Sequence, residues 1–243
     1  MTVALPEIYT SKLGEGEARV SVTKSYLMVG AISIVAFVAV TVLVFSNVTQ
    51  TADAQLALAI NHFGLGSAAT TVMVLFAEYG REYFWIPVVA VMMLLGNRET
   101  KLLAVELAVL FVVGIVLGEI MKSVVFRERP FEAMASIIAR VPIELDSSYP
   151  SGHALIVSIG AAFCMVKFRG KGVGLLFVLE AALVCYSRVY VGMHYPLDVV
   201  SAIFLGIGIV GIGLFVLERY LARPLASITS LTTRLLKDGP LEL

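Results

Sequence analysis

The chain carries little charge and few cysteines or histidines for its length of 243 residues. Only 15% of its residues are charged, whereas a typical soluble domain contains about 25%. Hydrophobic residues make up 59% of the chain and the mean hydropathy is +0.92, which excludes an ordinary soluble domain and indicates a membrane protein. Lys and Arg together number 18, as do Asp and Glu, so the net charge gives no sign of nucleic-acid binding.

The scarcity of cysteine and histidine also limits the chemistry that the chain can support. Cys164 and Cys185 both lie within apolar runs, which predicts packing residues rather than a disulfide framework or a zinc site. The sequence contains no recognisable set of metal ligands. We therefore expect neither a metal ion nor another cofactor.

Long apolar runs predict an all-α fold, a polytopic membrane helical bundle with six transmembrane helices and an active site at one membrane face. Residues 1–25 form a polar tail that is too long and too acidic for the start of a signal peptide. A single membrane domain follows over residues 26–220, and residues 221–243 form a second polar tail. The expected spans are residues 26–45, 83–96, 102–121, 153–166, 173–186 and 197–217.

The region 53–79 has intermediate hydrophobicity and a break at Gly64–Ser67. We expect interfacial or re-entrant helices there, and the alternative is a seventh span over residues 65–79. With six spans, most Lys and Arg residues fall on the side of the two termini, which predicts cytoplasmic termini in this multi-pass protein. The glycine pair Gly114 and Gly118, like the glycines of the last span, predicts close helix packing.

Three polar groups interrupt the apolar runs, all at the same end of their segments. In chain order they are Lys122 with Arg129-Pro130, then Pro150-Ser151-Gly152-His153, then Ser187-Arg188 with His194 and Asp198. The parity of the spans brings all three to one face, which we expect to be the outer one. So many costly polar groups at one membrane depth indicate chemistry, and this set can bind a phosphate, attack it and protonate the leaving group.

The segment His194-Tyr195-Pro196-Leu197-Asp198 suggests a nucleophile. Pro196 is favoured at the first position of a helix, so Asp198 falls in the first turn and can reach back to His194. A carboxylate on one ring nitrogen would leave the other nitrogen with its lone pair. The alternative is an acidic residue that complements the helix dipole beside an interfacial histidine.

The run Pro150-Ser151-Gly152-His153 opens another helix, whose free N–H groups form a natural phosphate cradle. Ser151 could donate its hydroxyl to a phosphate or serve only as a helix cap. His153 is placed to act as a general acid. Among the remaining cations, Arg127 and Arg140 are better explained as residues that extend toward the membrane surface.

These residues resemble the three signature motifs of the type 2 phosphatidic acid phosphatase superfamily, with a match at every signature position over Lys122–Asp198. The resemblance implies a metal-independent phosphatase in which His194 attacks phosphorus, Asp198 orients it and His153 protonates the leaving oxygen. The residues that it implies for phosphate binding are Lys122, Arg129, Ser151, Gly152 and Arg188. Integral members act mainly on lipid phosphates or diphosphates, including polyprenyl diphosphates, phosphatidylglycerophosphate and phosphatidic acid.

Three carboxylates lie within the predicted spans. Glu119 is three residues before Lys122, and we interpret it as a partner that holds this lysine. Glu106 lies near the inner interface, where it can reach water. Glu180 has no evident partner, and a hydrogen bond between helices is the simpler interpretation.

Three other functions compete with hydrolysis of a lipid phosphate. The same phosphohistidine could transfer its phosphate to a lipid or sugar hydroxyl. A vanadate-dependent haloperoxidase shares the site, but those relatives are soluble and six spans argue against it. A non-catalytic protein that binds or transports lipids would keep only remnants of the site, whereas both histidines are present.

Overall fold

The computed structural model describes residues 15–168 and 171–221, and within these ranges the fold is entirely helical. The elements in chain order are α2 (Glu15–Phe45), α3 (Gln50–Asn61), α4 (Gly66–Tyr79), α5 (Glu82–Leu95), α6 (Arg98–Val124), α7 (Pro130–Ala133), α8 (Gly152–Lys167), α9 (Lys171–Tyr190), α10 (Pro196–Val216) and the π-helical turn η1 (Leu217–Leu221). Most of the two predicted tails lies outside the described residues, but α2 already begins at Glu15.

Helix length and composition identify a multi-pass membrane protein. The helices that are long and apolar enough to cross a bilayer are Lys24–Phe45, Arg98–Val124, Gly172–Tyr190 and Pro196–Tyr220. Two more of the predicted spans are apolar but shorter, namely Glu82–Leu95 and Gly152–Lys167. By length alone, therefore, four of the six predicted spans are confirmed among the described residues.

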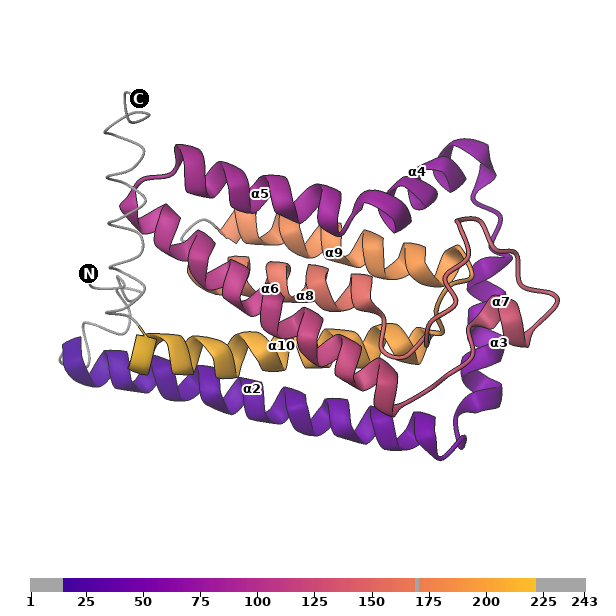
Figure 1. Ribbon diagram of the computed structural model, residues 1–243, viewed down its shortest axis with the longest axis horizontal. Helices are drawn as coiled ribbons and strands as arrows, with labels where there is room; N and C mark the ends of the chain where they lie inside the picture. The colour runs from indigo at the N-terminus through magenta and orange to yellow at the C-terminus, as the bar shows by residue number, and fades with distance from the viewer. Residues whose placement is uncertain (1–14, 169–170, 222–243) are drawn as a thin grey trace, which may run out of the picture.

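The long helices run side by side, and α2 lies along α10 (Figure 1). Glycines allow this close approach: a β-carbon at Gly211 would lie 2.6 Å from the carbonyl oxygen of Tyr26, and one at Gly114 would lie 2.4 Å from Ile159 Cδ1 on α8. The predicted role of these glycines in helix packing is confirmed.

The region 53–79 forms two helices that are neither of spanning length nor part of one continuous helix. Helix α3 lies across one end of the bundle, whereas α4 and α5 follow one another along one side (Figure 1). Helix α4 packs on α9, and Arg188 Nη1 donates to the carbonyl oxygen of Ala77 at 3.1 Å. Two helices are therefore present in this region, and their interfacial or re-entrant placement stays a prediction.

Helices α3 and α7 and the long segment before α8 gather at one end of the bundle (Figure 1). The start of α2 and the end of α10 lie at the opposite end. Near that second end, Lys167 Nζ lies 3.3 Å from Glu106 Oε2 and 2.8 Å from Glu218 Oε1. The expectation that Glu106 reaches water is wrong, because its side chain is only 9% exposed and faces this lysine.

Glu180 also differs from its expected role. Neither carboxylate oxygen of this buried side chain has a hydrogen-bond partner within the described parts of the chain. The predicted hydrogen bond between helices is therefore wrong.

Candidate active site

His194 lies in the short connection between α9 and α10, and its ring is buried. Its Nδ1 is 2.8 Å from the carbonyl oxygen of Ser148, which can only accept a hydrogen bond, so Nδ1 carries the proton. Burial and the positive charges of Arg188 and Arg129 hold the pKa of His194 well below its usual range. The neutral ring therefore keeps a lone pair on Nε2.

Two buried arginines face this lone pair. Arg129 Nη1 lies 3.3 Å from His194 Nε2, and Arg188 Nη2 lies 3.4 Å from the same atom. Arg129 precedes α7 and Arg188 is in the last turn of α9, so residues far apart in the sequence meet at one atom. The convergence expected from span parity is present in the structure.

Two carboxylates hold these cations in place. Glu144 bridges the arginines, with Oε2 at 2.6 Å from Arg129 Nη2 and Oε1 at 2.8 Å from Arg188 Nη2. Asp146 accepts from Arg129 Nη2 at 2.5 Å and from Lys122 Nζ through its other oxygen. Sequence reasoning missed both acids, although two carboxylates just before the run 150–153 offered a signal that the cations are neutralised locally.

The same pairs set the ionisation of the two acids. Burial raises the pKa of Asp146, but hydrogen bonds and charge from Lys122 and Arg129 outweigh it and bring that pKa to about 2. Burial acts in the same way on Glu144, and the positive charges of Arg188 and Arg129 keep its pKa below the usual range. Both groups are therefore carboxylates at neutral pH.

Asp198 lies beside His194 but is held mainly by other groups. Its Oδ2 is 3.7 Å from His194 Nδ1 and accepts instead from the backbone N–H of Tyr195 at 2.8 Å. Its Oδ1 pairs with Arg127 Nη1 at 2.5 Å, and Arg127 Nη2 pairs with Asp53 Oδ2 at 2.7 Å. The hydrogen bond on Nδ1 goes to Ser148, so Asp198 fixes the connection that carries the histidine rather than the ring itself.

Arg127 and Arg140 do not extend away from the protein, although the sequence predicts side chains that reach toward the membrane surface. The side chain of Arg127 is 13% exposed, its charge is shared by two buried carboxylates, and it covers the ring of Tyr195 at 3.9 Å. Burial lowers the pKa of Arg127, but the charges of Asp198 and Asp53 outweigh this and raise it. Arg140 Nη1 donates to the carbonyl oxygen of Tyr190 at 2.9 Å, so both arginines are bound to the protein.

The start of α8 forms the other wall of the site. The hydroxyl of Ser151 accepts from the backbone N–H of Ala154 at 3.4 Å, so in this structure Ser151 caps the helix. The backbone N–H of Ser151 donates to the carbonyl oxygen of Asp198 at 3.1 Å, which ties α8 to α10. His153 follows in the first turn, and its side chain is buried.

Glu119 pairs with Lys122, as the sequence predicts, but the contact is long and exposed. Its Oε1 lies 3.8 Å from Lys122 Nζ, but 69% of its side chain is exposed and Asp146 is the closer partner of the lysine. An exposed pair of this kind contributes at most about 1 kcal/mol.

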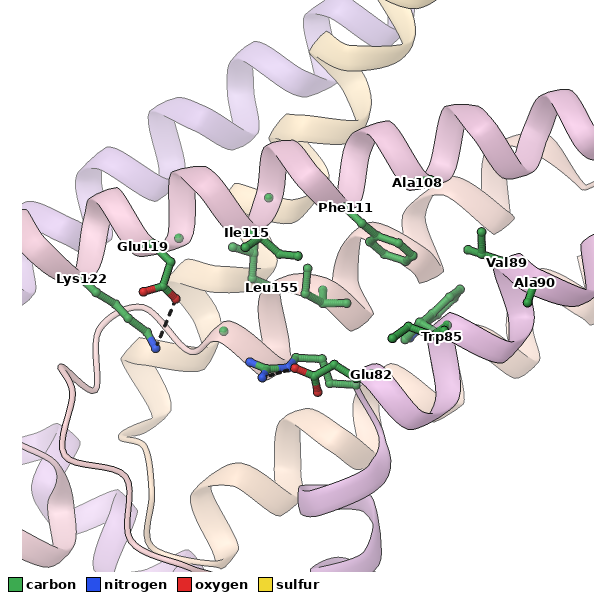
Figure 2. A pocket seen from close by; sticks show the side chains of 16 residues that line it. Glu82, Trp85, Val89, Ala90, Ala108, Phe111, Ile115, Glu119, Lys122 and Leu155 are labelled. Carbon is green, nitrogen blue, oxygen red and sulfur yellow. Dashed lines mark ion pairs between the residues drawn. The ribbon is translucent and has the colours of Figure 1, made fainter. Parts of the chain in front are cut away.

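A groove of about 480 Å³ lies between α5, α6 and α8, and two motif residues, Lys122 and Gly152, line it. Figure 2 shows Lys122 and Glu119 near one end, Glu82 nearer the middle, and Val89 and Ala90 near the other end. Its size lies within the ~300–1,000 Å³ range of small-molecule sites. The groove therefore joins a charged end to a long apolar wall.

The described residues contain no group of three or more His, Cys, Asp and Glu side chains placed to hold a metal ion. The donors next to His194 Nε2 are instead the guanidinium groups of Arg129 and Arg188. Such donors suit a phosphate.

The chain is similar to known membrane proteins in sequence and in fold. Residues 103–220 match the family model described as the PAP2 superfamily. The undecaprenyl-diphosphatase of Sulfolobus acidocaldarius is 45% identical over 135 residues, which cover 56% of this chain and 64% of that protein. The undecaprenyl-diphosphatase BcrC of Bacillus subtilis is 30% identical over 144 residues, which cover 58% of this chain and 71% of that protein.

A solved structure shares the arrangement of helices. The crystal structure of a transmembrane PAP2 type phosphatidylglycerolphosphate phosphatase from Bacillus subtilis aligns with a TM-score of 0.66 at 21% identity, covering 79% of this chain and 96% of that chain. At this identity the likeness shows the fold alone. The sequence relatives and the family model show that the chain belongs to the PAP2 superfamily.

Proposed function

We propose that this chain hydrolyses a lipid phosphate through a phosphohistidine formed at His194, with a polyprenyl diphosphate as its substrate class. The observation that carries the proposal is the lone pair on His194 Nε2, which faces two buried arginines at 3.3 Å and 3.4 Å. A nucleophile surrounded by fixed positive charge is what phosphoryl transfer requires, because its catalysis is mainly positioning and electrostatics.

The proposed reaction has two steps. His194 Nε2 attacks the terminal phosphorus while His153 protonates the departing oxygen, and His153 then activates the water that cleaves the phosphohistidine. The groups proposed to bind the phosphoryl oxygens are Lys122, Arg129, Ser151, Gly152 and Arg188. Arg188 Nε supports this assignment, because it is buried without a hydrogen-bond acceptor among the described residues.

The groove and the relatives support the choice of substrate. A polyprenyl diphosphate joins a long apolar chain to charged phosphates, and the groove joins an apolar wall to the charged site in the same way. Two of the sequence relatives named above are undecaprenyl-diphosphatases. We propose the same class of substrate here.

The proposed membrane arrangement has six spans, cytoplasmic termini and the active site at the outer face. Cysteine substitutions at the exposed residues Glu132 and Leu145 should react with an impermeant reagent added outside, and one at Arg98 should react only from inside. The native Cys164 and Cys185 are buried and should not react with the reagent. Reaction of Glu132→Cys and Leu145→Cys from opposite sides would contradict a single site at one face.

Phosphate release from purified full-length protein tests the activity. The substrates are farnesyl diphosphate, phosphatidylglycerophosphate and phosphatidic acid, with His194→Ala as the control. We expect the fastest release from the diphosphate. A phosphorylated acceptor without free phosphate would indicate a phosphotransferase, and no turnover of any of these lipids would favour a non-catalytic protein.

A further inference from the structure

Arg81 lies outside the three motifs but faces the site. It precedes α5, directly after the break that ends α4, and lines the charged end of the groove with Lys122 and Gly152. A β-carbon added at Gly152 would lie 3.2 Å from Arg81 Nη1, so the guanidinium sits against the start of α8. The side chain is 31% exposed, which leaves it accessible from the groove.

Arg81 also lies close to the proposed general acid. Its Nη1 faces Gly152, the residue directly before His153 in α8. Among the cations near His153, Arg188 does not line the groove, whereas Arg81 and Lys122 do. Of these cations, Arg81 and Lys122 therefore lie where the apolar chain of a bound lipid would join its phosphates.

We infer that Arg81 binds the phosphate that stays on the lipid and thereby selects a lipid diphosphate over a lipid monophosphate. This inference rests on the proposed function. If the terminal phosphate binds at His194 and the chain lies in the groove, the second phosphate of a diphosphate falls between them, beside Arg81. A lipid monophosphate places no charge at this position.

The reaction assigns a definite role to this contact. The new bond joins His194 Nε2 to the terminal phosphorus, and the bond from that phosphorus to the bridging oxygen breaks. The bridging oxygen keeps the electron pair and leaves as part of the lipid monophosphate, which gains a negative charge unless His153 supplies a proton. Arg81 stabilises this charge as it develops, so its contribution falls on the chemical step.

Glu82 holds Arg81 when no substrate is bound. The two side chains form an ion pair at the groove, with the Glu82 side chain 46% exposed. A guanidinium has five N–H donors, so Arg81 can keep part of this contact while it binds a phosphate. Figure 2 shows Glu82 facing the groove from the α5 side, across from Lys122 on α6.

Phosphate release from farnesyl diphosphate and farnesyl monophosphate tests the inference, because the two substrates share one chain. In Arg81→Gln, kcat/KM for the diphosphate should fall about 10- to 100-fold, the range for a lost charged hydrogen bond. The value for the monophosphate should change less than about twofold. Arg81→Lys keeps the positive charge but loses the planar guanidinium, so its kcat/KM for the diphosphate should lie between those of Arg81→Gln and wild type.

The exposed Arg98, at the other end of the bundle, provides a matched control, since Arg98→Gln removes the same charge and should change neither substrate. Equal losses for both substrates in folded Arg81→Gln or Arg81→Lys would overturn the inference while leaving the proposed function intact. If the wild-type protein releases phosphate from neither lipid, the proposed function itself fails.

Discussion

The two ends of the bundle each contain a buried ionic cluster, and the clusters differ in how their carboxylates are held. Around Lys167, both acids lie in helical segments and their side chains are only 9% and 11% exposed. Around Arg129 and Arg188, Glu144 and Asp146 come from the irregular segment before α8 and are 38% and 48% exposed. The acids of the first cluster are nearly closed to water, whereas those of the second are accessible to solvent.

This difference separates an ion cluster that stabilises the fold from one that can bind an anion. A phosphate that enters the site can take the place of exposed carboxylates on a loop, and the arginines keep a charged partner throughout. No such exchange is open to Glu106 and Glu218. The comparison therefore predicts losses of activity at one end and losses of stability alone at the other.

The largest effect should follow removal of the proposed nucleophile. His194→Ala should reduce turnover at least about 10⁴-fold, because the groups of a catalytic unit do not replace one another. No phosphoenzyme should form with any substrate, which radiolabelled substrate and rapid quenching can test. Labelled phosphate trapped on His194→Ala would show that another residue is the nucleophile.

His153→Ala should be the next most damaging change, but only for some substrates. Loss of a general acid costs about 10²–10⁴-fold, and the cost shrinks as the leaving group becomes more acidic. A nitrophenyl phosphate or a lipid diphosphate should therefore rescue His153→Ala far better than a simple monoester. Equal rescue of His194→Ala in the same assay would mean that the two roles are assigned wrongly.

Arg127→Met should reduce both stability and activity. It leaves Asp198 and Asp53 buried without their shared cation, and breaking a buried pair costs about 3–5 kcal/mol. Thermal unfolding in detergent measures the loss, and Arg98→Met supplies an exposed control.

We also expect the turnover of Asp198→Asn to lie between those of His153→Ala and wild type. The imidazole of His194 stays in this variant, but the connection between α9 and α10 that carries it is held less firmly.

Lys167→Met should reduce stability without changing the site. Its two partner carboxylates would lose their cation inside the bundle, so the free energy of unfolding should fall by about 3–5 kcal/mol, as for Arg127→Met. At a temperature where the variant is folded, kcat/KM should equal that of wild type. A lower kcat/KM in fully folded Lys167→Met would mean that the Lys167 cluster affects the active site, so that the two ends of the bundle are not independent.

The sequence predicts the helices and the motif residues because both depend on local signals. Apolar length marks the spans, and proline marks the start of α10. The partners of the motif residues depend on tertiary contacts instead. Asp53 accepts a hydrogen bond from the backbone N–H of Leu197, 144 residues later in the chain, and no local pattern predicts that contact. The groove likewise depends on how α5, α6 and α8 pack, so Arg81 could not be assigned to it in advance.

Asp146→Asn should have the smallest effect, and it tests whether the acids at the site are displaceable. The folded pKa of about 2 lies below the unfolded value of about 3.9, so Asp146 stabilises the fold fully above about pH 4 and less as the pH falls toward 2. Because the side chain is 48% exposed, the loss at pH 7 should stay below about 1 kcal/mol. The difference in melting temperature between variant and wild type should shrink over the same interval. If Asp146 competes with phosphate for Lys122 and Arg129, inorganic phosphate should inhibit Asp146→Asn at lower concentrations than wild type. Weaker inhibition would instead show that the carboxylate positions these cations for the phosphate.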